Sequence, residues 1–241
     1  MKILEKFQSK QKNLFENAPV TIAFLGDSVT QGCFECYFDQ NNNVQTVFDA
    51  KCSYPTRVKE ILNILYPSVQ INLINSGISG DNAAGGNARF ERDIAPYSPD
   101  LVIVSFGLND AGKGIKYTDD YVKQLKEIFG KVKALGAECI FVFQNMMNTN
   151  VSCHLKETRE QDTAKCFAKI QNEGILDCYY TAAKQAAKES GVKFCDVYAA
   201  WKHMYENGVE VTELLANKYN HPIRELHYYT AMKVVETIFN I

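Results

Sequence analysis

The sequence lacks any run of about 18 uninterrupted apolar residues, the length that a membrane-spanning helix requires. Its first 17 residues carry charges where a secretory signal needs an apolar core. Low-complexity segments, internal repeats and linkers rich in proline, glycine or serine are also missing. We therefore expect a soluble, cytoplasmic protein that has no membrane span and forms a single domain over residues 1–241.

An excess of basic residues is missing as well. The chain has 26 lysines and arginines against 28 aspartates and glutamates, which gives a formal net charge of −2. Proteins that bind nucleic acid need a basic patch or stripe that neutralises phosphates. Nucleic acid is therefore not an expected partner.

A second Cys-x-x-Cys pair is absent, although the chain has eight cysteines and one such pair, Cys33 and Cys36. The nearest histidine, His154, is far away in the sequence, so the spacing of a zinc site is incomplete. Disulfide frameworks belong mainly to shorter secreted chains. We expect most of the cysteines to be buried thiols, and we expect no metal.

Short apolar runs rich in β-branched residues recur along the chain, and each is too brief for a typical helix. Because they are almost continuously apolar, they indicate strands that are covered on both faces, as in a parallel sheet. Patterns typical of helices lie between them and after the last one. The predicted strands are 20–25, 69–74, 101–106, 139–143 and 192–197, and the predicted helices are 56–65, 82–94, 118–135, 175–190 and 225–239.

This alternation predicts an α/β protein, a three-layer α/β/α sandwich around a five-stranded parallel sheet. In such sheets the ligand lies outside the carboxyl ends of the strands. Segments 33–53 and 145–171 are long and irregular or only weakly helical in pattern. Long segments of this kind usually carry specificity or form a lid.

A serine directly follows the first predicted strand, in Gly26-Asp27-Ser28. This position places its hydroxyl at the carboxyl edge of the sheet, where Ser28 can act as a nucleophile. The alternative is that Asp27 or Ser28 only caps the helix that follows.

Two oxyanion donors are predicted at the next two strand ends. Gly80, in Ile-Ser-Gly-Asp, lets a backbone N–H approach the reacting centre closely, and Asn109, in Gly107-Leu-Asn-Asp110, offers its side-chain amide. The backbone amide of Ser28 is a third candidate. Each feature taken alone is also explained by an ordinary turn after a strand.

The chain has only four histidines from which a general base can be chosen. His221 precedes Pro222 and the last predicted helix, so its backbone is held in a defined extended turn. His154, His203 and His227 lack such a setting; we expect His227 to be structural and His203 to be solvated. His221 is therefore the predicted base for Ser28.

Together these blocks resemble the SGNH, or GDSL, hydrolase family over almost the whole chain. The resemblance implies a flavodoxin-like fold, hydrolysis of esters or thioesters through an acyl-serine intermediate, and no metal or other cofactor. The Gly-x-Ser-x-Gly elbow of the α/β-hydrolases is absent around Ser28. The matching blocks also contain three residues that we expect to support the site, Asp27, Asp110 and Asn220.

One position departs from the family pattern. The family usually has an aspartate three residues before the histidine, and here that position is Lys218. A backbone carbonyl, Asn217, Asn220 or Glu213 can take over the orientation of the imidazole. Lys218 also favours an alternative from another class, a catalytically weak relative that binds a sugar or acyl ligand.

Aromatic residues in two segments resemble the branch of the family that acts on short acyl groups, often acetyl esters of sugars. Aromatic rings stack on sugar faces, but they also form cores. We expect an acetyl or short-chain acyl esterase whose substrate is a small-molecule or glycan ester, with lysophospholipase or thioesterase as alternatives. A nucleotide-binding protein fits poorly, because no Gly-x-Gly-x-x-Gly or phosphate-loop motif follows the first strand. The aromatic residues are Phe34, Tyr37, Phe38, Tyr198 and Trp201.

Overall fold

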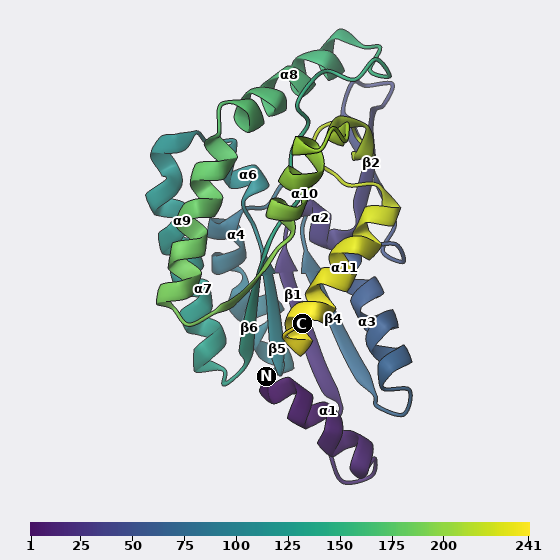
Figure 1. Cartoon of the computed structure of the whole chain (residues 1–241), viewed down its shortest axis with the longest axis vertical. Coiled ribbons are helices and arrows are strands. Elements are labelled where there is room, and N and C mark those ends of the chain that lie inside the picture. The colour runs from purple at the N-terminus through teal and green to yellow at the C-terminus, as the bar shows by residue number, and fades with distance from the viewer.

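Five parallel strands form the central sheet of the computed structural model, which describes residues 1–241 (Figure 1). Their order across the sheet is β4-β1-β5-β6-β7, so the chain first moves to one side of β1 and then to the other. This is the flavodoxin-like order, and the switch point lies at β1. The predicted fold class is confirmed. The strands are β1 (Val20–Gly26), β4 (Ile71–Gly77), β5 (Leu101–Ser105), β6 (Glu138–Phe143) and β7 (Lys193–Asp196).

Helices cover both faces of the sheet, which explains why the strands are so apolar. On one side α3 and α11 contact each other, and on the other α7 contacts both α4 and α9 (Figure 1). Every residue of the central strand β5 is consequently buried. The helices predicted from the sequence lie within a few residues of their expected ends. They are α3 (Tyr54–Leu65), α7 (Thr118–Ala134), α9 (Ile175–Glu189) and α11 (Arg224–Phe239).

The helix predicted over 82–94 is broken. It forms α4 (Ala83–Ala88) and α5 (Phe90–Asp93), separated at Arg89, whose ψ of 3° is not helical. The break lets the buried Arg89 guanidinium reach the carbonyls of Gly26 and Ser76. Further short elements connect the main ones: α2 (Ser28–Gln31), α6 (Leu108–Ala111), η1 (Ala95–Tyr97), η2 (Ile115–Tyr117) and η3 (Val211–Leu214).

The expectation that segment 33–53 is irregular is wrong. It forms an antiparallel hairpin of β2 (Cys33–Phe38) and β3 (Val44–Phe48), with an irregular register between Cys33 and Cys36. Asp39 closes the turn, because its carboxylate accepts hydrogen bonds from the backbone amides of Asn41 and Asn43. Both strands are partly exposed and contain polar residues, Glu35 in β2 and Gln45 and Thr46 in β3, so neither forms a continuous apolar run.

Segment 145–171 also contains more structure than its sequence indicates. Its second half belongs to α8 (Thr158–Asn172), which begins with a capping box of Glu157 and Glu160. Figure 1 shows α8 at the same end of the molecule as the hairpin, above the carboxyl ends of the strands. Two further helices are outside the predicted set, α1 (Lys2–Lys12) and α10 (Val197–Glu206).

The prediction that most cysteines are buried is wrong, since only Cys33 and Cys195 are. Cys166 and Cys178 lie on the exposed sides of α8 and α9, and all eight thiols are free. No group of three or more histidine, cysteine, aspartate or glutamate side chains is arranged to hold a metal ion.

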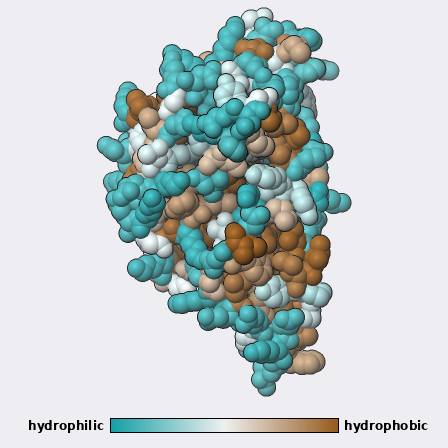
Figure 2. Space-filling view, viewed as in Figure 1, coloured by the Kyte–Doolittle hydropathy of each residue, from teal (hydrophilic) through white to brown (hydrophobic).

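The surface is predominantly polar in the view of Figure 2, where hydrophobic side chains gather only in smaller areas between hydrophilic ones. None of the helices combines the length and the apolar character needed to cross a membrane.

Candidate active site

Ser28 lies at the carboxyl end of β1, the strand at the switch point, as the first residue of α2. The helix cap is provided by Asp27, whose Oδ1 accepts a hydrogen bond from the amide of Val29 at 3.0 Å. The Ser28 hydroxyl is therefore not needed as a cap. It is almost fully buried, with 3% of the residue exposed, and it faces His221.

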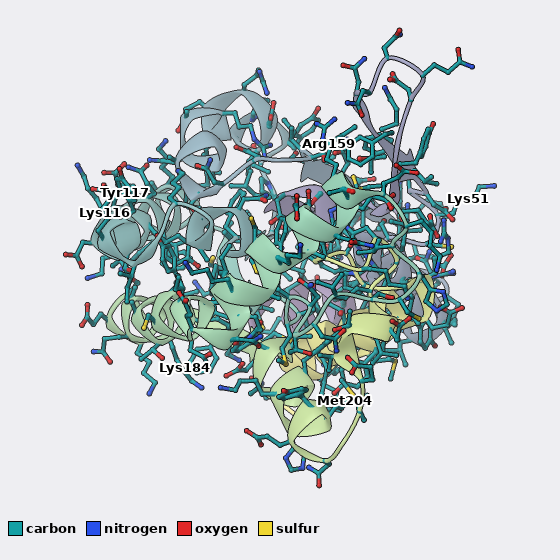
Figure 3. The ribbon with its side chains drawn as sticks, turned by 90° about the horizontal axis from the view of Figure 1, so that it is seen from above. Lys51, Lys116, Tyr117, Arg159, Lys184 and Met204 are labelled. Atoms are coloured by element: carbon teal, nitrogen blue, oxygen red, sulfur yellow. The ribbon has the colours of Figure 1, made fainter.

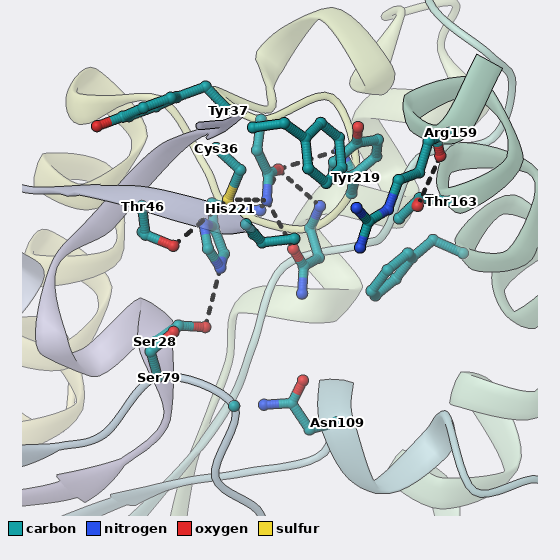
Figure 4. Close-up of a pocket in the computed structure, with 16 residues that line it drawn as sticks. Ser28, Cys36, Tyr37, Thr46, Ser79, Asn109, Arg159, Thr163, Tyr219 and His221 are labelled. Atoms are coloured by element: carbon teal, nitrogen blue, oxygen red, sulfur yellow. Dashed lines mark hydrogen bonds between the residues drawn. The ribbon is translucent and has the colours of Figure 1, made fainter. Parts of the chain in front are cut away.

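His221 is brought to Ser28 by the loop before α11, from 193 residues further along the chain. Its Nε2 lies 2.9 Å from Ser28 Oγ (Figure 4). The side chain of Asn217 shapes this loop, because its Oδ1 accepts hydrogen bonds from the amides of Tyr219, Asn220 and His221, each at 3.0 Å. A short β-bridge between Leu215 and Pro222 closes the loop.

The other ring nitrogen of His221, Nδ1, lies 2.9 Å from the backbone carbonyl oxygen of Phe34 in β2. A carbonyl can only accept a hydrogen bond, so Nδ1 must carry the proton. In the neutral ring Nε2 then carries no proton, and its lone pair is directed at the serine hydroxyl. Burial lowers the pKa of His221 to about 4, so the ring is neutral at pH 7. This is the protonation state that a general base requires.

The expected oxyanion donors surround Ser28 on the two neighbouring strand ends. The backbone amide of Gly80, after β4, has no acceptor in the protein, and the Ser28 amide begins α2, where no intrahelical acceptor exists. The Asn109 amide, after β5, donates to the Asp81 carbonyl at 2.7 Å. That bond uses one of its two N–H groups and holds the side-chain nitrogen beside the backbone that follows β4.

The reason expected for glycine at position 80 needs correction. A Cβ atom there would meet nothing within 4 Å, so a side chain would not block the approach of the backbone. The turn instead gives Gly80 a φ of +79°, which glycine adopts without strain.

A cavity of about 250 Å³ opens beside Ser28 and His221. Its floor is the sheet edge, and its walls come from the hairpin, from α8 and from the His221 loop (Figure 4). The two long segments expected to carry specificity thus meet at the candidate site. The lining residues are Ser28, Cys36, Tyr37, Phe38, Val44, Thr46, Ser79, Gly80, Asn109, Arg159, Thr163, Phe167, Asn217, Tyr219, Asn220 and His221.

Comparison with known proteins agrees with this geometry. The model of the GDSL-like lipase/acylhydrolase family matches residues 24–227, which span all four sequence blocks. The chain belongs to this family. The resemblance inferred from the blocks is confirmed, and the protein is a carboxylic ester hydrolase.

Relatives of this GDSL-family hydrolase include an acetylxylan esterase from Geobacillus stearothermophilus. The two are 25% identical over 192 residues, which cover 76% of this chain and 78% of the relative. A solved structure of a mutant acetyl-xylooligosaccharide esterase from the same organism has a TM-score of 0.66 at 25% identity, covering 91% of this chain and 94% of the other. A two-domain esterase active on acetylated mannans shares the fold, with a TM-score of 0.69 at 18% identity over 98% of this chain and 52% of its own.

The departure at Lys218 has a structural explanation in this hydrolase. Lys218 Nζ lies 2.9 Å from Glu213 Oε2, so the lysine forms a salt bridge with Glu213 and does not contact the imidazole of His221. Among the alternatives, the structure shows a backbone carbonyl at Nδ1, that of Phe34, whereas Asn217, Asn220 and Glu213 make no hydrogen bond to the ring. Sequence reasoning could not find Phe34, because every residue carries a carbonyl.

The three residues expected to support the site of the hydrolase are all buried beside it. Asp110 accepts from the amide of Ala83 at 3.1 Å, and burial raises its pKa to about 6. Burial likewise raises the pKa of Asp27 to about 7, against the opposing hydrogen bond from Gln144. Asn220 accepts a hydrogen bond from Asn217 and thereby belongs to the His221 loop.

Gln144 is a buried neighbour of the candidate site that sequence reasoning missed. Its Nε2 lies 2.9 Å from both carboxylate oxygens of Asp27, and it is buried at the carboxyl end of β6. A polar residue directly after an apolar strand, on the same sheet edge as Ser28, was the signal that could have revealed it.

The remaining histidines lie outside the pocket. His227 is buried in α11, and its Nδ1 accepts a hydrogen bond from the amide of Tyr54, which confirms a structural setting. His203 is solvated, as expected, with 81% of its side chain exposed. His154 is exposed and lies 3.6 Å from Glu213.

Only part of the predicted aromatic set lines the pocket. Tyr37 and Phe38 do, whereas Phe34, Tyr198 and Trp201 are buried. Two aromatic residues that sequence reasoning missed, Phe167 and Tyr219, stack on each other along the pocket wall, with ring centroids 6.0 Å apart.

Proposed function

We propose that this GDSL-family hydrolase removes acetyl and other short acyl groups from carbohydrate esters, through an acyl intermediate on Ser28. The observation that carries the proposal is the pair of hydrogen bonds to His221. Ser28 Oγ lies 2.9 Å from Nε2, while the Phe34 carbonyl holds the proton on Nδ1. The base is thereby fixed in the tautomer that can accept the serine proton.

The first half-reaction follows from this arrangement. His221 Nε2 takes the proton from Ser28 Oγ as the oxygen attacks the ester carbonyl carbon. The carbonyl oxygen becomes negatively charged and accepts hydrogen bonds from the free amides of Ser28 and Gly80 and from Asn109. As the bond to the alcohol breaks, the imidazolium returns the proton to the departing oxygen. An acyl-Ser28 ester remains.

In the second half-reaction His221 takes a proton from a water molecule, whose oxygen attacks the acyl carbon. The same donors hold the second oxyanion, and the imidazolium returns the proton to Ser28 Oγ as the carboxylic acid leaves. The Phe34 carbonyl keeps the ring in place in both steps, although a neutral dipole stabilises the imidazolium less than an aspartate would.

Pocket size and lining support a short acyl group and a sugar. A volume of about 250 Å³ is below the range of pockets that enclose drug-sized ligands, which favours a short acyl group over a long lipid chain. The lining includes the aromatic residues Tyr37, Phe38 and Tyr219, and a sugar can stack on the ring faces that Arg159 and Phe167 leave open. The acetylxylan esterase relative, by its name, acts on an acetylated polysaccharide.

Two measurements test this proposal. The first is labelling by a fluorophosphonate probe, located by peptide mass spectrometry, in the wild type and in Ser28→Ala and His221→Ala. We expect labelling at Ser28 in the wild type, none in Ser28→Ala and strongly slowed labelling in His221→Ala. His203→Ala, which removes an exposed histidine outside the pocket, is the matched control and should label normally. A folded wild type that stays unlabelled contradicts an activated serine.

The second measurement compares p-nitrophenyl esters of increasing acyl length and then acetylated xylooligosaccharides. We expect kcat/KM to be highest for acetate and to fall as the chain lengthens. A maximum at eight or more carbons would favour the lysophospholipase alternative. Release of acetate from the oligosaccharides supports the carbohydrate substrate.

A further inference from the structure

Arg159, on α8, differs from every other arginine of the protein. The chain contains five arginines. Four of them form salt bridges with carboxylates, and Arg159 forms none. The unpaired arginine is also the one that lines the cavity beside Ser28 and His221.

The guanidinium of Arg159 is held in place without a carboxylate partner. Its Nη1 donates to the carbonyl of Asn42 in the hairpin turn at 2.6 Å, and its Cζ lies 4.3 Å above the ring centroid of Phe38. Figure 3 shows Arg159 on α8 next to the hairpin, and Figure 4 shows its guanidinium directed into the pocket. Nε and Nη2 make no hydrogen bond in the protein, so two neighbouring donors remain free.

No charge in the pocket lining opposes Arg159. The 16 lining residues include no aspartate or glutamate, and His221 is neutral at pH 7 because burial lowers its pKa to about 4. The cavity therefore carries one positive charge, with no negative charge among its lining residues.

We infer that the natural substrate is an acetylated sugar that carries a carboxylate, as uronic acids do, and that Arg159 selects it. This inference rests on the proposed function and names its substrate class. The free Nε and Nη2 donors match the two oxygens of a carboxylate, a geometry that arginine binds in a bidentate manner. One positive charge suits a monoanion better than a phosphate monoester, which carries nearly two charges.

The capping of α8 also supports recognition of the carboxylate by the Arg159 side chain. The capping box of Glu157 and Glu160 places two carboxylates at the start of α8, and these disfavour an anion at the free backbone amides of the first helical turn. Recognition of the anion therefore depends on the Arg159 side chain, and a single substitution of Arg159 should abolish this recognition.

The experiment uses two acetylated glycosides that differ in one group, a uronic acid and its neutral uronamide. We expect wild-type kcat/KM for the uronate to exceed that for the uronamide by about tenfold to a hundredfold, mainly through a lower KM, as charged hydrogen bonds predict. Raising the ionic strength should reduce this ratio, because Arg159 is exposed and salt screens exposed charges.

Three variants show whether Arg159 causes the preference. In Arg159→Gln the ratio should fall to about one, and Arg159→Lys should retain part of it. Arg92→Gln is the matched control, since Arg92 is exposed and lies outside the pocket, and it should keep the wild-type ratio. Loss of the Asn42 contact alone would change both substrates equally and leave the ratio intact.

The possible failures can be told apart. If the wild type hydrolyses both glycosides at equal kcat/KM, or if Arg159→Gln keeps the preference, the inference is overturned and the proposed function stands. If the wild type releases acetate from neither, the proposed function fails and the inference fails with it.

Discussion

The two halves of the candidate site are built differently. The sheet-edge half, with Ser28, Gly80 and Asn109, places residues directly after three adjacent strands. The hairpin half supplies the Phe34 carbonyl, and α8 adds Arg159 at the pocket wall. In the proposed mechanism the first half contacts the atoms that react, and the second half orients the base or selects the substrate. Substitutions should therefore lower turnover more in the first half than in the second.

The largest of the effects that we predict lies in the sheet-edge half. In Asn109→Ala we expect kcat to fall about a hundredfold or more, because one oxyanion donor is lost. KM and the thermal midpoint should change little. Asn109→Asp, which keeps the size but removes the N–H donors, should lose a similar factor. Unchanged turnover in steady-state assays would remove Asn109 from the oxyanion site.

The next effect is the pH dependence of the base. His221 must be neutral to accept the serine proton, and burial lowers its pKa to about 4. The contribution of this group to kcat/KM should therefore be constant from pH 7 down to about 5. It should fall about tenfold for each pH unit below about 4. An acid limb near 6.5 in the pH–rate profile would contradict the buried setting of the ring.

A smaller effect is expected where the hairpin is anchored. The Arg224 guanidinium donates hydrogen bonds to both carboxylate oxygens of Glu35, the residue next to Phe34. Its Cζ also lies 4.3 Å from the centre of the Phe34 ring. In Arg224→Gln the carbonyl that orients His221 becomes less well held, so we expect kcat to fall about fivefold to tenfold. Arg224→Lys should recover part of the loss. A drop equal to that of Asn109→Ala would abolish the distinction between the two halves.

The smallest effect is expected at the position that departs from the family. Lys218→Asp restores the aspartate that the family usually has, yet the Nδ1 proton of His221 is already bonded to Phe34. Position 218 has a φ of +63°, and its side chain pairs with Glu213. We expect kcat to change less than about threefold in the same assay. A large gain would mean that the Phe34 carbonyl is a poor substitute.

Much of the fold was predictable because its central strands are buried on both faces. Almost continuously apolar runs such as 101–106 and 139–143 correspond to β5 and β6 within a residue or two. The hairpin and α8 were not predictable in this way, since partly exposed elements carry mixed patterns. The broken helix at Arg89 escaped prediction because its cause is a contact with the distant carbonyl of Gly26.

For the site, the sequence predicted the members of the sheet-edge half but not their geometry. The parallel topology guarantees that residues after β4, β1 and β5 share one edge, and that is where Gly80, Ser28 and Asn109 lie. Their catalytic roles stay predictions until the variants are measured. Gln144 follows the same rule, and it was overlooked although it stands after β6.

The sequence alone determined the α/β fold class and the four blocks, because periodicity and strand-end motifs are local properties of a chain. Only the tertiary structure decided which atom orients His221 and which arginine remains unpaired in the pocket. Both depend on contacts between segments more than a hundred residues apart, Phe34 with His221 and Asn42 with Arg159. Every residue has a backbone carbonyl, so the sequence does not indicate that the carbonyl of Phe34 orients His221. Whether an arginine such as Arg159 lacks a carboxylate partner depends on its neighbours in the fold, which the sequence does not show either.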